Sequence, residues 1–188
     1  MQGLSLWLSV AALLLLAGGV VFYYNRLVFN RARVAEAWSG IDVQLKRRSS
    51  LIPALVQCVR QYMQHEQGTL QALVEERARA VQLADSALDQ RAPVEAHLSS
   101  QLRQLFALVE NYPALKADGQ FLDLQRSISE VEEHIQMARR YYNGAVRELN
   151  VLVESVPSNW VARPFGFVQA EYFSLDDSRE AQPPQMGF

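Results

Sequence analysis

GLSLWLSVAALLLLAGGVVFYY, residues 3–24, is an uncharged and almost wholly apolar stretch. At about 1.5 Å per residue, a helix over these residues would be about 33 Å long, enough to cross a hydrocarbon core of about 30 Å. Tyr23 and Tyr24 stand at its end, where a membrane-spanning helix places its interfacial aromatic side chains. The stretch predicts a transmembrane anchor within residues 1–24.

A cleaved signal peptide is the alternative interpretation of this stretch. Signal peptides begin with basic residues and end in small residues at the cleavage site. This chain has no Lys or Arg before Arg26, and the apolar run ends in bulky side chains from Val20 to Tyr24. An uncleaved anchor is therefore favoured.

Basic residues gather just after the anchor. Residues 25–60 contain seven Arg or Lys and two acidic residues, and Arg26, Arg31 and Arg33 lie closest to the apolar run. Because basic residues concentrate on the cytoplasmic side of a span, we expect the N-terminus outside and the remainder in the cytoplasm. The expected location is the bacterial cell (inner) membrane, crossed once.

The rest of the chain reads as amphipathic helices, since apolar residues recur at helical spacing and no window alternates as a strand would. The first helix should continue from the anchor, because no Gly or Pro lies between the end of the anchor at Tyr24 and Gly40. Further helices are expected over residues 51–89, 93–112 and 119–156. Ser49 and Ser50 would cap the second helix, and Pro93 would open the third. Unbroken, the second helix would be about 58 Å long and, running antiparallel to the first, would reach the bilayer. It should therefore bend, break or end between Gly68 and Ala84; alternatively, the first helix kinks at Asn25 or Asn30 and the bundle lies tilted.

The last helix has an apolar residue at every position of a strict three-four spacing, namely 121, 124, 128, 131, 135, 138, 142, 145, 149 and 152. Such a seam suits an intermolecular coiled coil or the core of a bundle within one chain. The other helices also need partners, which favours the internal core. We predict an all-α fold: a single N-terminal transmembrane helix continuing into an antiparallel up-and-down four-helix bundle over residues 25–157. An aromatic-rich segment at 158–173 and a disordered tail at 174–188 would follow.

Several short motifs resemble the LemA family. In chain order they are Tyr24–Val28, Val34–Arg48, Leu51–Pro53, His65-Glu66, Leu122–Gln125, Arg139–Asn143, Val156–Asn159 and Phe165–Phe167. The resemblance covers about 150 residues, in order. It implies a membrane-anchored, antiparallel four-helix bundle. It implies no settled biochemical activity and supplies no catalytic residues.

Lys46, Arg47 and Arg48 form a basic cluster that is a candidate partner-binding site. Lipid headgroups or an acidic partner would suit its charge. On a straight helix, however, Arg48 stands about 35 Å from the anchor, which excludes headgroup contact. The structural alternative is an ion pair between Asp42 and Lys46, with Arg48 meeting an acid on another helix.

Trp160, Phe165 and Phe167 are the second set of candidate partner-binding residues. They belong to an aromatic-rich stretch with little regular pattern, from Trp160 to Phe173. Its rings suit packing over the end of the bundle, insertion into the membrane interface or docking of a partner. These alternatives stay open at this stage.

Chemistry-bearing motifs are absent from the sequence. His65-Glu66 is followed by Thr69 where a zinc-binding helix needs a second histidine, and neither a nucleophile motif nor a glycine-rich phosphate loop occurs. Convergence of His65, His97 and His134 with Cys58 or Glu130 on a metal is less favoured than ordinary roles for these residues. We expect no catalytic activity, no metal and no cofactor.

A net charge of −2 gives no basis for nucleic-acid binding. The favoured function is a scaffold or adaptor, held in the lipid bilayer through residues 3–24. It would present its bundle to an unidentified membrane protein or to copies of itself. Alternatives are a cofactor- or metal-binding bundle protein and an oligomer that organises the membrane.

Overall fold

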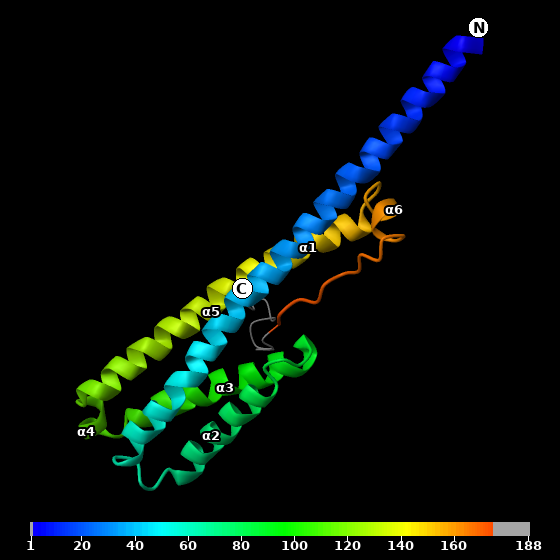
Figure 1. Ribbon diagram of the computed structural model, residues 1–188. Helices are drawn as coiled ribbons and strands as arrows, with labels where there is room; N and C mark the ends of the chain where they lie inside the picture. Colours follow the sequence, from blue (N-terminus) through cyan, green and yellow to red (C-terminus); the bar gives the residue numbers. More distant parts are fainter. Residues whose placement is uncertain (1, 175–188) are drawn as a thin grey trace, which may run out of the picture. The chain divides into compact units, whose positions relative to one another are not determined.

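The computed structural model describes residues 2–174, and among these it contains helices and no strand. In chain order the helices are α1 (Gln2–Arg60), α2 (Gln67–Gln82), α3 (Leu88–Val109), α4 (Pro113–Lys116), α5 (Gly119–Glu154) and α6 (Asn159–Ala162) (Figure 1). The predicted all-helical fold is confirmed, whereas the antiparallel four-helix topology stays a prediction. The predicted disordered tail lies, from residue 175 on, outside the described residues.

Helix α1 is unbroken from Gln2 to Arg60, so the anchor and the following amphipathic stripe form one helix, as predicted. Its N-terminal section is long and apolar enough, by length and composition, to cross a membrane, and that section is not buried inside the protein. Farther along, Leu27 and Ile41 of the same helix are fully buried. One helix thus has an apolar section that no other part of the described chain covers, which we call the bare apolar section, and a section whose apolar side chains are buried in the protein core.

The predicted helix break at Ser49 and Ser50 is wrong. The Ser50 hydroxyl donates to the Arg47 carbonyl over 2.7 Å, one turn back along the same helix, and so does not cap a new one. Pro53 has no N–H to donate to the Ser49 carbonyl. Nε of Arg77, on α2, donates to that carbonyl over 2.9 Å and replaces the missing bond. The helix therefore continues past the proline to Arg60.

The remaining helix ends agree in part with the sequence. The helix predicted over residues 51–89 is interrupted between Arg60 and Gln67, before the predicted interval, so that break was missed. Helix α2 then ends at Gln82, inside the interval, and α5 begins at Gly119 as expected. The Phe121 N–H donates to Oδ1 of Asp118 over 2.9 Å, so Asp118 caps α5. Helix α3 begins at Leu88, five residues before Pro93, and the prediction that Pro93 opens it is wrong. A proline there removes a single hydrogen bond, which the helix tolerates.

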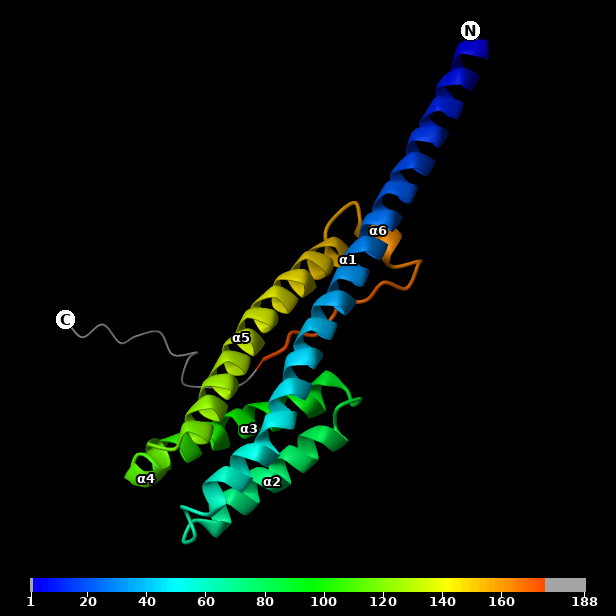
Figure 2. The ribbon, with the colours of Figure 1, turned by 60° about the vertical axis from the view of Figure 1, so that its left-hand side comes forward.

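The described chain divides into two compact units, and α1 and α5 contribute to both. Unit 1 comprises residues 2–39 and 140–172, and unit 2 comprises residues 40–139 with 173 and 174. In unit 2, α2 and α3 lie side by side next to the end of α1 in two views (Figures 1 and 2). The unit 2 core draws on α1 to α5 and includes Leu55, Val59, Leu73, Leu102, Leu105, Leu115, Phe121 and Ile128. The core of unit 1 includes Leu27, Leu149, Leu152, Val161, Ala162 and Phe167.

The apolar seam of α5 is covered within the chain. Eight of its ten residues are buried, and the other two, Leu124 and Ala138, are partly buried. A seam open to a coiled-coil partner would leave these side chains exposed in the single chain. Their burial agrees with the interpretation as an internal core.

Candidate functional site

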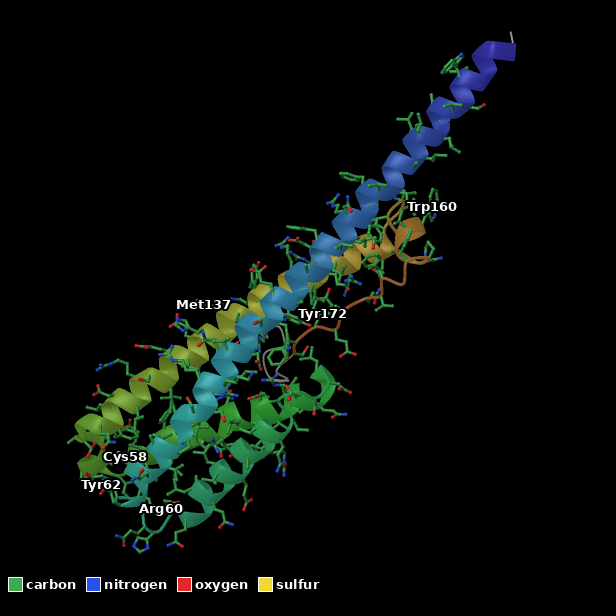
Figure 3. The ribbon with its side chains drawn as sticks, viewed as in Figure 1. Cys58, Arg60, Tyr62, Met137, Trp160 and Tyr172 are labelled. Carbon is green, nitrogen blue, oxygen red and sulfur yellow. The ribbon has the colours of Figure 1, made fainter. Side chains whose placement is uncertain are left out.

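The candidate site lies in unit 1, where the bare apolar section of α1 ends. A loop of residues 155–168, which includes α6, packs there against α1; we call it the 155–168 loop. The ring of Tyr24, the last residue of the predicted anchor, meets Phe165 and Phe167 edge to face, with centroids 5.0 Å and 5.9 Å away. Figure 3 shows Trp160 of the same loop near the blue section of α1. The loop therefore stands beside the end of the apolar run.

A glycine turn sets the direction of the two phenylalanines. The Phe167 N–H donates to the Ala162 carbonyl over 3.0 Å, and the Gly166 N–H donates to the Arg163 carbonyl over 3.2 Å. With Gly166 at a φ of 71°, these bonds form a Schellman motif after α6. The motif turns Phe167 back onto Ala162 in the core and leaves Phe165 outside.

The three aromatic candidates consequently differ in exposure. Trp160 is 71% exposed and Phe165 54% exposed, whereas Phe167 is 7% exposed. Phe167 also has the guanidinium carbon of Arg31 at 5.0 Å from its ring centroid, a cation–π contact. Trp160 and Phe165 present free surface, and Phe167 holds the loop in place.

Arginines line the adjoining surface of α1 and α5. A groove of about 410 Å³ lies between these helices, with Arg26, Phe29, Asn30, Arg33, Arg147, Glu148, Val151 and Leu152 along its walls. Nη1 of Arg33 lies 2.5 Å from Oε2 of Glu148. A hydrogen bond with Tyr141 and the charge of Glu148 raise the pKa of Arg33, which keeps it charged. The groove is basic overall, since Glu148 is its one acidic wall residue.

The segment after the loop is tied to α5 by polar contacts. Asn150 forms hydrogen bonds with both backbone groups of Ala170, and the Tyr142 hydroxyl donates to the Glu171 carbonyl over 3.0 Å. The Tyr142 ring meets Trp38 of α1 at a centroid distance of 5.6 Å. Burial, and next the charge of Glu171, raise the pKa of Tyr142. These contacts fix the course of the chain that leaves the 155–168 loop.

The basic cluster of the sequence lies in unit 2 and divides by exposure. Lys46 and Arg47 are exposed, and Nζ of Lys46 lies 2.7 Å from Oδ2 of Asp42. Arg48 is 1% exposed. Its guanidinium contacts three groups on other helices: Oε1 of Glu132 at 2.7 Å, the Ser99 hydroxyl and the Glu95 carboxylate. The two ion pairs of the structural alternative are therefore present.

Arg91, which was not among the predicted site residues, extends this ion-pair network. Its side chain is almost fully buried, with Nη2 at 2.7 Å from Oδ1 of Asp42 and Nε at 3.5 Å from Oε1 of Glu95. Burial alone would raise the pKa of Asp42, but hydrogen bonds from Lys46 and Arg91 lower it on balance. The spacing of Arg91 and Glu95, four residues apart on one helix, was the available signal.

Cys58 and Tyr62, labelled in Figure 3, lie at the end of α1 near α4. The Tyr62 hydroxyl donates to Oδ2 of Asp118 over 2.9 Å, and Sγ of Cys58 lies 3.9 Å from Oδ1 of the same carboxylate. Burial and the charge of Asp118 raise the pKa of the Cys58 thiol. A protonated, buried thiol is a poor nucleophile, which agrees with an inert role.

The described residues contain no group of three or more His, Cys, Asp or Glu side chains placed to hold a metal ion. His65, His97 and His134 therefore do not converge in this part of the chain. What the residues at the 155–168 loop offer is a binding surface, with exposed apolar rings beside arginine side chains.

Comparisons with known proteins agree with the motifs in the sequence. The model of the LemA family matches residues 37–188. Magnetosome protein MamQ 2 of Paramagnetospirillum magneticum is 23% identical over 190 aligned residues, which cover 88% of this chain and 70% of that protein. Protein LemA of Metamycoplasma hominis is 25% identical over 167 residues, covering 84% of this chain and 74% of that protein.

Proposed function

Because the chain belongs to the LemA family, we propose that it is a single-pass, membrane-anchored scaffold without catalytic activity. Residues 3–24 cross the bacterial inner membrane, with the N-terminus outside and the helical body in the cytoplasm. The body, an antiparallel up-and-down four-helix bundle, docks an unidentified membrane protein or further copies of this chain.

The observation that carries the proposal is the contrast between the two sections of α1. Leu13 to Leu16 are each at least 65% exposed, whereas Leu27 and Ile41 of the same helix are fully buried. Apolar surface left in water is unfavourable by about 25 cal/mol per Å². The leucines therefore require apolar surroundings, and a bilayer supplies them along the whole run.

Extraction of membranes tests the anchoring. The full chain should stay with the membrane after alkaline washing, whereas Leu14→Lys combined with Leu15→Lys should release it, because each central lysine costs about 3 kcal/mol in the bilayer. The matched control, Leu14→Ile with Leu15→Ile, should stay membrane-bound. Release of the unchanged protein by the wash would contradict the anchor.

Labelling of single cysteines tests the orientation. In a Cys58→Ser background, Gln2→Cys should react with an impermeant maleimide on spheroplasts, and Arg140→Cys should react only after lysis. The reverse pattern would place the body outside the cytoplasm.

Cross-linking in native membranes tests the scaffold role separately from the anchor. Exposed lysines, Lys46 among them, should link to a stoichiometric partner or to a second copy of the chain. A protein that stays membrane-bound but is recovered only as an unlinked monomer would contradict the scaffold and leave the anchor standing.

A further inference from the structure

Large apolar side chains remain exposed on the 155–168 loop although the loop itself is packed into unit 1. Val156, Trp160, Phe165 and Val168 are each more than half exposed, while Val161 and Phe167 of the same loop are buried. Scattered apolar residues are ordinary on a surface, but a gathering of large ones marks a contact surface. The loop is therefore fixed on its inner side and available on its outer side.

The position of the loop along α1 indicates what covers its exposed apolar side chains. Tyr24 ends the apolar run, and the Phe165 ring lies 5.0 Å from the Tyr24 ring. The interfacial layer on each side of a hydrocarbon core is about 5 to 8 Å deep. With the run spanning the core, the Phe165 ring lies no more than 5.0 Å from the level of the Tyr24 ring, at the boundary between the core and that layer. The bilayer that the apolar run requires would therefore extend as far as the loop.

The charges on the loop and on the neighbouring part of α1 also favour a lipid surface. The 155–168 loop contains one charged residue, Arg163, which is exposed, and no acidic residue. On α1, Arg26 is exposed and stands about 3 Å beyond Tyr24 along the helix axis. Arginine guanidinium groups bind phosphate oxygens through paired hydrogen bonds. Apolar rings flanked by arginines match the glycerol and phosphate layers of an anionic membrane.

We infer that the 155–168 loop is a second membrane contact beside the anchor. Trp160 and Phe165 enter the interfacial layer, and Arg163 and Arg26 bind the phosphate groups of anionic phospholipids. The contact rests on the anchoring proposed above. It turns a single point of attachment into two and limits how unit 1 swings about the end of the span.

Fluorescence quenching in reconstituted vesicles tests the contact. The full chain carrying Trp7→Phe and Trp38→Phe retains Trp160 as its only tryptophan. In phosphatidylglycerol-containing vesicles whose lipids carry bromine near the glycerol end of the acyl chains, Trp160 emission should be strongly quenched and blue-shifted. As a matched control, Trp160→Phe with Tyr172→Trp moves the reporter to an exposed residue that follows the segment tied to Tyr142. That reporter should not be quenched.

A second reporter and a charge reversal complete the test. A nitroxide on Phe165→Cys, in a Cys58→Ser background, should be more accessible to oxygen than to a water-soluble nickel reagent. Each basic residue near an anionic surface strengthens binding about fivefold, so Arg163→Glu should reduce the quenching, whereas Arg140→Glu, on α5 away from the loop, should not. Loss of quenching in purely zwitterionic vesicles would identify the phosphate source as anionic lipid.

The outcomes separate this contact from the anchor on which it rests. A chain that does not float with the vesicles contradicts the anchoring itself. A chain that floats, while Trp160 stays unquenched and the Phe165 nitroxide stays accessible to the nickel reagent, overturns the second contact alone. Cross-linking of the loop to another protein in native membranes, with Trp160 unquenched in the vesicles, would overturn the lipid contact and assign the surface to a protein partner.

Discussion

Asn150 and Ala170 are joined by two hydrogen bonds that imitate one rung of a β-ladder: Nδ2 donates to the Ala170 carbonyl over 2.9 Å, and Oδ1 accepts from the Ala170 N–H over 2.8 Å. Asn150→Ala leaves both backbone groups without this partner and should destabilise unit 1 by about 1–3 kcal/mol. Hydrogen exchange of the Ala170 amide should accelerate. Val151→Ala, an exposed neighbour on the same helix, should leave that exchange rate unchanged. Equal rates in both variants would show that Asn150 does not hold the segment.

The buried guanidinium of Arg48 should be far more important for stability than its neighbour in the sequence. Arg48→Ala removes the Arg48 cation from the Glu132 and Glu95 carboxylates, leaving Glu95 with Arg91, and should cost about 3–5 kcal/mol in chemical unfolding. Arg47→Ala, at an exposed position, should stay within about 0.5 kcal/mol. In a double-mutant cycle, Arg48→Ala and Glu95→Ala should be strongly non-additive. Coupling near zero would contradict the network.

The bond from Arg77 to the Ser49 carbonyl should matter only while Pro53 is present. Arg77→Ala should destabilise the protein by about 1 kcal/mol, the usual effect of one lost hydrogen bond. In a Pro53→Ala background the new backbone N–H satisfies Ser49, and Arg77→Ala should then cost much less. Thermal unfolding of the four proteins in detergent measures the difference. An equal effect in both backgrounds would rule out the replacement.

Two glycines of unit 1 should respond to alanine with opposite signs. An added Cβ has open space at both Gly166 and Gly144, so backbone conformation decides the outcome. At Gly166, where φ is 71°, alanine should destabilise by about 1–2 kcal/mol. At Gly144, inside α5, alanine should stabilise by about 0.5–1 kcal/mol. Unfolding midpoints compare the two, and a shift of the same sign in both would contradict the turn.

Acid should weaken the cap of α5. A hydrogen bond from the Phe121 backbone N–H and another from Tyr62 lower the pKa of Asp118 below its usual 3.8. A lowered folded-state pKa means that the carboxylate stabilises the fold at pH values above about 4, and that this contribution is lost as the pH falls through the lowered value. In Asp118→Asn, the melting temperature should depend less on pH over that acidic range. An identical fall in melting temperature at acidic pH in both proteins would show that Asp118 does not contribute to the pH dependence.

The long-range pattern of the sequence predicted the all-helical fold class and two features of its helices. The uncharged run before Arg26 gave the exposed section of α1, and the three-four spacing from Phe121 to Leu152 gave a buried face of α5. Both signals repeat over many residues, so no single side chain decides them. The helix breaks were harder, because proline and serine rules describe an isolated helix. The bond from Arg77, distant in sequence, overrides them at Ser49.

The sequence predicted which aromatic residues belong to the candidate site, but not how they are arranged. The aromatic residues after Trp160 were visible in the sequence, but their division into exposed and buried rings depends on the turn at Gly166. The sequence from Arg163 to Phe167 contains the glycine and the apolar residue that a Schellman motif requires, so the turn itself has a signal in the sequence. The burial of Arg48 and Arg91 requires knowing which helices meet, and one chain read alone does not supply it.

Helix α1 also couples rotation of its apolar run to rotation of the unit 1 core. Tyr24 contacts the 155–168 loop and Leu27 enters the core of unit 1, with no flexible joint between them. One residue inserted there would twist the apolar run by about 100° relative to the core, and about seven residues would be needed to restore the phase. The rotational orientation of the apolar run about its own axis is therefore fixed relative to the core of unit 1.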